Sequence, residues 1–328
     1  ATTAEATAAY MFWTVTLGAV PAILNVVMAY LVRAEGSAMH ASVGTMSGCL
    51  LNILLDPIFI LPWGLNLGAA GAGLATCISN VAACLYFAVL LLVKRGHTYV
   101  CVHPKKFWCG RRIMGGVFAV GIPASIQNLL NVTGMTVLNN FTAAYGASAV
   151  AAMGIAQKIN IVPMYVSMGI SQGIMPLISY NYASGNVDRM KQTVRFSRKA
   201  ALSIILLISA FYFLLPGVMV SLFMQDPEIV QYGSRFLRGF CLGLPFLCVD
   251  FLAVGVFQAV GMGREALAFA ILRKVLLEIP ALLILNWLFP LYGLAYAQFI
   301  AECILSVAAV LVLRRLFRRL ESQPRPSP

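Results

Sequence analysis

The stretch AGAGLATCISNVAACLYFAVLLLV (residues 70–93) contains no Asp, Glu, Lys or Arg over 24 positions. At 1.5 Å per residue, a helix of this length measures about 36 Å, which exceeds the roughly 30 Å hydrocarbon core of a bilayer. Of the whole 328-residue chain, 60% is hydrophobic and 10% is charged, and the mean hydropathy is +0.86. A water-soluble domain does not have this composition, so the sequence predicts a membrane protein.

Similar apolar runs recur on both sides of this stretch, separated by short clusters of Lys, Arg, Gly and Pro. Backbone groups in hydrocarbon find hydrogen-bond partners only within helices or closed barrels, and the alternation typical of a membrane barrel is absent from this sequence. The sequence therefore predicts an all-α polytopic membrane protein. Its nine expected transmembrane helices span residues 9–32, 40–62, 70–93, 114–141, 148–180, 199–224, 230–257, 266–289 and 292–313.

The net charge of +12 indicates how the chain is oriented in the membrane. Lys and Arg cluster in every second loop, whereas the loops between them contain neither residue. Because cytoplasmic loops are enriched in Lys and Arg, we expect a multi-pass protein of the inner (plasma) membrane with a cytoplasmic C-terminus. Nucleic-acid binding would require one basic stripe with interleaved aromatic residues, which this pattern does not provide. The basic clusters are at 33, 94–112, 189–199, 264 and 314–319.

Metal sites and enzyme active sites find little support in the sequence. Cys101 and Cys109 lie beside His97 and His103, but their spacing matches no paired C-x-x-C zinc pattern, so no metal is assigned. An intramembrane enzyme would need a nucleophile with a base or a metal triad, and the H-E-x-x-H zinc motif is absent. We expect neither enzymatic activity nor a resident cofactor.

An internal repeat relates the two ends of the chain. Gly36 and Gly261 are 225 positions apart, and the same offset relates Gly68 to Gly293. Self-similarity at a fixed offset indicates duplicated structural units. Spans one to three therefore correspond to spans seven to nine, and spans four to six have no partner. We expect a native protein of about twelve helices in two pseudo-symmetric six-helix lobes, of which the first lobe is incomplete in this chain.

Seven short motifs, in this order and at these separations, resemble those of the multidrug and toxic compound extrusion (MATE) family. They are RAEG (33–36), LLNILLDPIFI (50–60), LGAAGAGLATCIS (67–79), GIPASIQNLL (121–130), GISQGIMPLISYNYASGN (169–186), GLPF (243–246) and FQAVGMGREA (257–266). The sequence departs from the family pattern at Ala183, where a glycine is usual, and in span four, which has no acidic residue.

The resemblance implies a secondary active transporter that exports organic cations or drugs from a central cavity, by antiport with sodium ions or protons. Its expected partners are small organic cations and the lipid bilayer, and a monomer is expected. The implied organisation is a partial N-terminal lobe (1–93), a cytoplasmic inter-lobe loop (94–113), a C-terminal six-helix lobe (114–320) and a cytoplasmic tail (321–328).

The coupling ion is left open by the sequence. In one sodium-coupled branch of the family, acids in the helices that correspond to spans four and seven carry coupling. Span seven contains Asp250, which lies about one turn from the expected position, so that role is not transferred to it. Asp250 is nevertheless a candidate site residue, because an ionised side chain in a membrane span requires a partner, a cavity or neutralisation.

Asp56 is the candidate ion or substrate site in span two. It belongs to the LLNILLDP motif, and Asn52 lies one turn away on the same helical face. One interpretation is that Asp56 satisfies backbone groups beside the Pro57 kink; the other is that it binds a proton or cation in the cavity. Both interpretations stay open.

Spans four and five contribute the remaining candidates. Gln127 and Asn131 share a helical face, where they either bind substrate or form hydrogen bonds between helices. Lys158 is expected to pair with a carboxylate, for which Asp250 and Glu302 are the candidates, whereas Glu278 is expected to pair with a nearby Arg or Lys. Met164 and Met168 either pack in the bundle or form a soft wall for varied substrates.

Lipid-linked oligosaccharide flipping is the alternative transport function. A flippase would need a cluster of buried Arg residues to hold a pyrophosphate, and spans two, four and seven offer none. Drug or organic-cation export is therefore the leading hypothesis.

Overall fold

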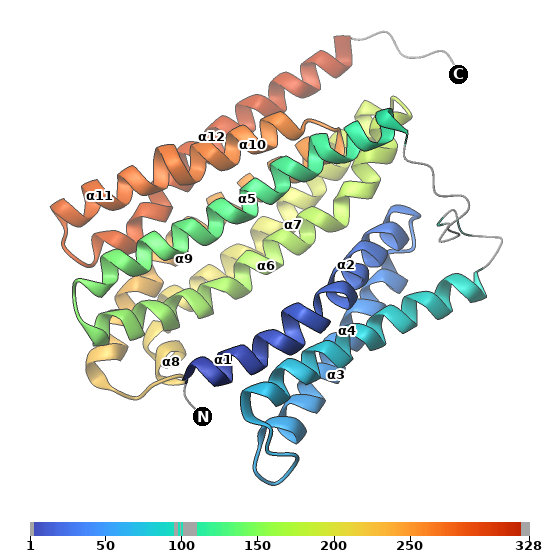
Figure 1. The fold of residues 1–328 in the computed structure, drawn as a ribbon. Coiled ribbons are helices and arrows are strands. Elements are labelled where there is room, and N and C mark those ends of the chain that lie inside the picture. Colours follow the sequence, from blue (N-terminus) through green and yellow to red (C-terminus); the bar gives the residue numbers. More distant parts are fainter. Residues whose placement is uncertain (1–2, 95–97, 99, 101–109, 323–328) are drawn as a thin grey trace. The chain divides into compact units, whose positions relative to one another are not determined.

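The computed structural model describes residues 3–94, 98, 100 and 110–322, and no strand occurs among them (Figure 1). The prediction of an all-helical chain is confirmed. The chain forms two compact units, Ala1–Trp108 and Cys109–Pro328. The four residues considered as a metal site, at 97, 101, 103 and 109, lie outside the described residues, as do most of the predicted inter-lobe loop and C-terminal tail.

The first unit bends sharply near its start. Wide π-helical turns precede Gly18, and the chain bends there by 50°. A Cβ atom at Gly18 would lie 2.5 Å from the carbonyl oxygen of Trp13, so the bend requires glycine. Gly48 likewise lets α3 approach α4, because its Cβ would lie 3.1 Å from that of Ala83. The elements are α1 (Thr3–Met11), η1 (Phe12–Leu17), α2 (Ala19–Ala34), α3 (Ala38–Ile60) and α4 (Gly68–Val93).

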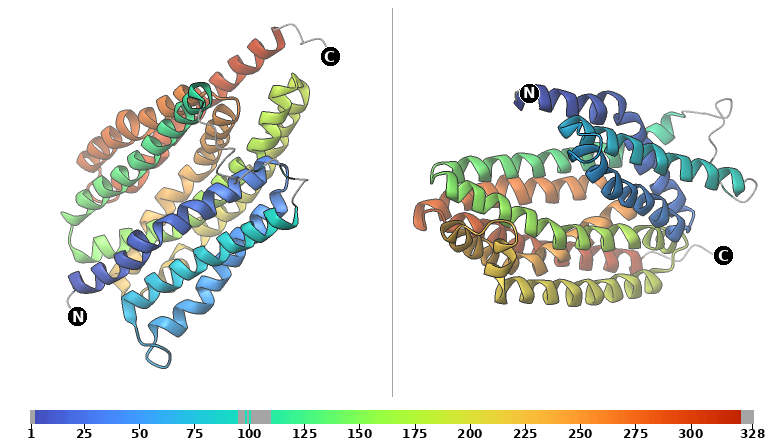
Figure 2. Two further views of the ribbon diagram at one scale, coloured as in Figure 1. Left: turned by 45° about the vertical axis from the view of Figure 1, so that its right-hand side comes forward. Right: turned by 90° about the horizontal axis from the view of Figure 1, so that it is seen from below.

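The second unit is built around α9. In the most apolar window of this helix 72% of the residues are buried, against at most 33% for any other candidate span, and α9 contacts α6, α7, α10 and α12. The helices of this unit run along a common direction (Figure 2). They are α5 (Arg111–Ala143), α6 (Ala147–Ala183), α7 (Val187–Leu214), α8 (Pro216–Ser221), α9 (Pro227–Ala259), α10 (Gly263–Ile271), η3 (Leu272–Glu278), α11 (Ile279–Leu288) and α12 (Gly293–Ser322).

Two glycines one turn apart let α9 and α12 pack backbone to backbone. A Cβ atom at Gly239 would lie 2.8 Å from the Cβ of Ala295, and one at Gly243 would lie 3.3 Å from the Cα of Phe299. Such small-xxx-small contacts are the usual way in which membrane helices associate, because lipid supplies no hydrophobic drive between apolar helices. This close packing fixes where the α9 and α12 side chains meet.

Seven helices of the described residues are long and apolar enough to cross a membrane, and the bent pair Ala4–Leu17 and Ala19–Ala34 would make an eighth span. The chain is therefore a multi-pass membrane protein. The predicted span 266–289 is divided into α10, η3 and α11, so the count of nine stays a prediction.

Two segments predicted as loops are helical instead. The basic stretch 189–199 lies within α7, and the basic stretch 314–319 lies within α12. Arg and Lys are good helix formers, and the surface of a bilayer does not interrupt backbone hydrogen bonds, so both helices continue beyond their apolar parts.

The backbone has the same features at positions 225 residues apart. Gly36 and Gly261 have φ angles of 83° and 80°. Asn66 and Leu291, which are the non-glycine residues with positive φ in the described part of the chain, have φ angles of 51° and 67°. The offset seen in the sequence thus recurs in backbone conformations that most residues avoid.

The glycine contact between α9 and α12 predicts opposite effects for two Gly→Ala substitutions. Gly239→Ala should destabilise the protein by about 1–3 kcal/mol through overpacking against Ala295. Gly116→Ala, in α5 with open space around it, should stabilise by about 0.4–1 kcal/mol. Thermal unfolding in detergent measures both. A rise in Tm for both variants would contradict the close packing.

Candidate functional site

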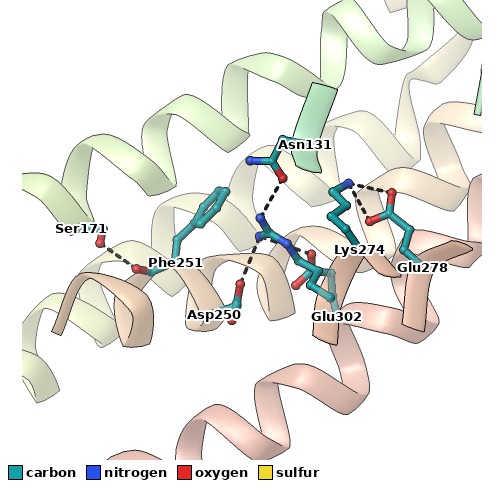
Figure 3. Close-up of polar contacts among 8 residues, drawn as sticks. Asn131, Ser171, Asp250, Phe251, Lys274, Glu278 and Glu302 are labelled. Carbon is teal, nitrogen blue, oxygen red and sulfur yellow. Dashed lines mark hydrogen bonds and ion pairs between the residues drawn. The ribbon is translucent and has the colours of Figure 1, made fainter. Parts of the chain in front are cut away.

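A buried cluster of charged residues joins four elements of the second unit (Figure 3). Arg273 of η3 donates from Nη1 to Oδ2 of Asp250 on α9 at 3.1 Å, and the same nitrogen lies 3.9 Å from Oε1 of Glu302 on α12. Its Nη2 donates to Oδ1 of Asn131 on α5 at 2.9 Å. The guanidinium is therefore the hub that connects α5, α9 and α12.

A second ion pair lies beside this hub. Lys274 and Glu278 form an ion pair one turn apart, with Nζ at 2.7 Å and 2.6 Å from the two carboxylate oxygens. A Cβ atom at Gly134 would lie 3.2 Å from this Nζ, so glycine leaves room for Lys274 beneath α5. The prediction that Glu278 pairs with a nearby Arg or Lys is confirmed.

The wide turns of η3 place two consecutive basic residues against the bundle. In a regular helix successive side chains point about 100° apart, whereas π-helical turns widen the backbone locally and are frequent at functional sites. η3 covers Leu272–Glu278, and within it both Arg273 and Lys274 reach carboxylates. This segment also divides the predicted span 266–289.

The Arg273 cluster is almost completely shielded from solvent. Asp250 and Glu302 are each 1% exposed and Arg273 is 2% exposed. The guanidinium also lies 5.3 Å from the ring centre of Phe251, whose carbonyl oxygen accepts a hydrogen bond from Ser171 of α6 at 2.7 Å. A buried charge that loses its partners is strongly unfavourable. The ion pairs and the contact with Phe251 therefore hold the charged groups in a fixed arrangement.

Within the group formed by Arg273, Asp250 and Glu302, three polar atoms have no hydrogen-bond partner among the described residues. They are Oδ1 of Asp250, Oε2 of Glu302 and Nε of Arg273. Buried polar atoms are nearly always hydrogen-bonded in native proteins, and exceptions mark places where another group binds or a proton moves. The unpaired carboxylate oxygens therefore leave acceptor capacity for a proton or small cation.

The cluster lies deep within the apolar part of its helices. Glu302 is nine residues from the first residue of α12 and Asp250 is nine residues from the last residue of α9, which corresponds to about 14 Å in each case. This distance is about half the thickness of a bilayer core. An intramembrane ionisable group at this depth is by default a functional-site hypothesis.

The MatE family model matches residues 123–284, which include most of this cluster. Over 299 residues the chain is 36% identical to the multidrug export protein MepA of Staphylococcus aureus (strain bovine RF122 / ET3-1), covering 91% of this chain and 65% of that protein. A solved outward-facing multidrug resistance MATE family transporter has a TM-score of 0.89 at 26% identity, covering 96% of this chain and 70% of that one. The chain belongs to the MATE family.

A second curated relative agrees with this membership. The multidrug export protein MepA of Staphylococcus haemolyticus (strain JCSC1435) is 35% identical over 300 residues, covering 91% of this chain and 65% of that protein. This MATE chain thus spans about two thirds of the length of the curated relatives it matches.

Among the predicted site residues of this MATE protein, Asp250 and Asn131 meet in the Arg273 cluster. Gln127, one turn before Asn131, is half-buried, and among the described residues no hydrogen bond joins its side chain to the cluster. The prediction that Asp250 or Glu302 pairs with Lys158 is wrong, because both acids face Arg273. Lys158 is exposed and has no carboxylate partner among the described residues, as a long cationic side chain remains near water where it can.

The other predicted residues lie elsewhere. Asn52 of α3 donates to Oδ1 of Asp56 at 3.3 Å, and both are half-buried, so the pair on one helical face is present in the first unit. Met164 packs against a buried cluster around Ile159, which matches the packing interpretation. Met168 is half-buried. These positions remain predictions for substrate binding.

The stretch GISQG (169–173) also matches the G-x-S-x-G pattern of serine hydrolases. That pattern requires a sharp turn between a strand and a helix, with a histidine base nearby. Ser171 instead lies inside α6 and donates to the carbonyl oxygen of Phe251. The match carries no nucleophile.

Sequence reasoning missed the central role of Arg273, although the internal repeat contained a signal for it. With the 225-residue offset, Arg273 corresponds to Gly48, and Glu302 corresponds to Cys77. Small or weakly polar residues in the first half are thus replaced by charged ones in the second. A charged residue at a position where the other repeat has a small one is not required by helix packing, so such a difference points to a functional position.

Removing the hub should destabilise the protein far more than removing an exposed cation. Arg273→Gln leaves Asp250 and Glu302 without their cation, and breaking a buried ion pair costs about 3–5 kcal/mol. Adding Asp250→Asn to this variant should restore part of the loss, because one fewer carboxylate is left unpaired.

Lys158→Gln is the matched control, with an expected change within about 0.5 kcal/mol. Thermal unfolding of the three variants in detergent gives the comparison. Equal losses for Arg273→Gln and Lys158→Gln would refute the role of Arg273 as a hub.

Proposed function

We propose that the protein is a secondary active transporter that exports organic cations or drugs across the inner (plasma) membrane by antiport with a monovalent cation. The names of the curated relatives support the direction of transport, since they are multidrug export proteins. The observation that carries the proposal is a buried charge cluster at about half the depth of the membrane, in which the acids outnumber the cations by one.

Three carboxylates face two cations in this cluster. Asp250, Glu278 and Glu302 are arranged around Arg273 and Lys274, so the fully ionised cluster has one negative charge in excess. An uncompensated charge surrounded by apolar helices is strongly unfavourable. One bound monovalent cation neutralises the cluster. An antiporter requires a site that binds and releases a defined number of coupling ions, and this cluster would bind one.

A proton fits this site better than a sodium ion. Glu302 is the carboxylate with the longer contact to Arg273, 3.9 Å against 3.1 Å for Asp250, and its Oε2 has no partner among the described residues. A sodium ion at Glu302 would be repelled by the nearby positive charge of the Arg273 guanidinium. A proton on the carboxyl group makes that group neutral, so no separate cation lies beside Arg273. Proton coupling is therefore our proposal.

Protonation changes which helices are tied together. While Glu302 is ionised, Arg273 attracts both α9 and α12; once Glu302 is neutral, Arg273 retains only Asp250 and Asn131. A site that holds three helices in one charge state and two in the other biases a conformational equilibrium. Coupling follows if the two conformations also differ in affinity for the drug.

The substrate is proposed to bind among the polar residues that are less deeply buried. In the first unit, Asp56, with Asn52 beside it, offers a half-buried carboxylate to an organic cation. In the second unit, considered by itself, half-buried Met164 and Met168 are proposed to offer adaptable apolar surface. Lipid-linked oligosaccharide flipping remains the alternative. It is less well supported, because the buried Arg273 is already held by carboxylates and the surrounding cluster is negative, which disfavours a pyrophosphate.

We further propose nine spans in two pseudo-symmetric lobes, with the C-terminus in the cytoplasm. The matched backbone angles at Gly36 and Gly261 support the duplication. The concentration of Arg at the end of α12 supports the orientation, because Lys and Arg are enriched on the cytoplasmic side.

Two charge-removing substitutions test the function. Glu302→Gln should keep expression and fold but reduce efflux of ethidium at least about tenfold, because the cluster no longer exchanges a proton.

Asp56→Asn should also be expressed normally. If Asp56 binds substrate, drug resistance falls in this variant. If Asp56 only supports the Pro57 kink, export stays normal. Efflux from cells lacking their own pumps, normalised to protein in the membrane, is the measurement, with Lys158→Gln as control. Normal efflux by a well-expressed Glu302→Gln variant would rule out the proposed coupling site.

A further inference from the structure

A second feature of the C-terminal unit is a basic groove between the ends of α7 and α12. The groove has a volume of about 350 Å³. Its walls carry five cationic side chains and one acid: Lys191, Arg195, Arg198, Arg314, Arg318 and Glu321. Its floor consists of four apolar residues: Val194, Val310, Leu313 and Phe317.

The helical register builds this groove from both sides. On α7, Lys191, Arg195 and Arg198 follow one another at spacings of four and three, and on α12, Arg314 and Arg318 are four apart. Residues at such spacings lie on one face of a helix. Val194, Leu313 and Phe317 pack on a buried cluster around Met190. The cations are therefore held around a hydrophobic floor by two packed helices.

Most of the positive charge in the groove lacks a partner within the protein. Lys191 pairs with Glu321 and also lies 5.8 Å from the ring centre of Phe317. The four arginines have no carboxylate partner in the part of the chain that the structure describes. Four guanidinium groups around a groove of this size form a strongly attractive site for an anion.

The position of the groove along its helices places it at the level of the lipid headgroups. α12 begins at Gly293, and Arg314 is 21 residues further on, about 32 Å along the helix axis. This matches the thickness of the hydrocarbon core, so the cationic walls lie where lipid phosphates are concentrated. The floor residue Val310 lies one turn earlier, within reach of the upper part of an acyl chain.

We propose that this groove binds an anionic phospholipid of the inner leaflet, with the lipid phosphate held by Arg195, Arg198, Arg314 and Arg318 and the first acyl segment on the apolar floor. Charge complementarity favours an anionic over a zwitterionic lipid, and the apolar floor favours a lipid over a free phosphate. Basic pockets between membrane helices on the cytoplasmic side recognise lipid headgroups in this way. The groove shares no residue with the Arg273 cluster, and its proposed role is independent of the proposed antiport.

The matched test uses two pairs of arginines on the same helix. Arg314→Gln with Arg318→Gln removes two groove cations, whereas Arg315→Gln with Arg319→Gln removes two exposed cations that do not line the groove. The purified protein in detergent is titrated with dioleoyl phosphatidylglycerol, and bound lipid is counted by native mass spectrometry, with dioleoyl phosphatidylcholine as the neutral comparison. Unchanged thermal unfolding of both variants shows that they remain folded.

The groove pair should weaken phosphatidylglycerol binding by about 10- to 30-fold, since each basic residue near an anionic lipid contributes about a factor of five. The control pair should change it less than about threefold. Equal losses for the two pairs would overturn the proposal, because they would indicate only a general attraction to charge. Equal binding of phosphatidylcholine, or displacement of the lipid by millimolar inorganic phosphate, would overturn it as well.

Discussion

The ion pair between Arg273 and Asp250 is the constraint on which the arrangement of the second unit depends. Both side chains lie deep in the apolar part of a membrane helix bundle, where an unpaired charge is strongly disfavoured. Once Arg273 is present, α9 must present a carboxylate to it, α12 must approach closely, and α5 must supply a hydrogen-bond acceptor. The close backbone contact at Gly239, the wide turns of η3 and the position of Asn131 each serve this requirement.

In the proposed function, the same constraint connects stability with transport. A buried cluster with equal numbers of acids and cations would be a purely structural element, because no further ion is needed for neutrality. Here three acids meet two cations, and in the proposed mechanism the remaining charge makes the stability of one helix arrangement depend on a bound proton. A coupling free energy of 1–3 kcal/mol is typical of linked sites, which is smaller than the cost of breaking a buried pair. The cluster can therefore shift a conformational equilibrium without unfolding the protein.

Much of the fold was predictable from sequence because membrane helices are specified by composition. Long apolar runs with few charges give α3, α4 and α9 directly, and the 225-residue offset anticipates the matching backbone at Gly36 and Gly261. The helix ends were less predictable. The basic parts of α7 and α12 were expected to be loops, since hydropathy marks where a helix leaves hydrocarbon and gives no information about where its backbone hydrogen bonds stop.

The candidate site was only partly predictable, for a different physical reason. Asp250 and Asn131 were recognisable as polar residues in apolar spans, but which partner each acid finds depends on how α9, η3 and α12 pack. Lys158 and Arg273 are both basic residues within predicted spans, and no local pattern distinguishes the exposed one from the buried one. That choice is made by the π-helical turns of η3, which periodicity does not reveal.

The central claim, that the Arg273 cluster holds one proton to balance its charge, is tested most directly by infrared difference spectroscopy of the purified protein. A carboxylic acid and a carboxylate absorb at distinct frequencies, so the number of protonated carboxyl groups can be followed as pH rises. The account predicts one protonated carboxyl signal that is lost in Glu302→Gln and retained in Lys158→Gln. If Asp250, Glu278 and Glu302 are all ionised at neutral pH with no sodium present, the account is contradicted.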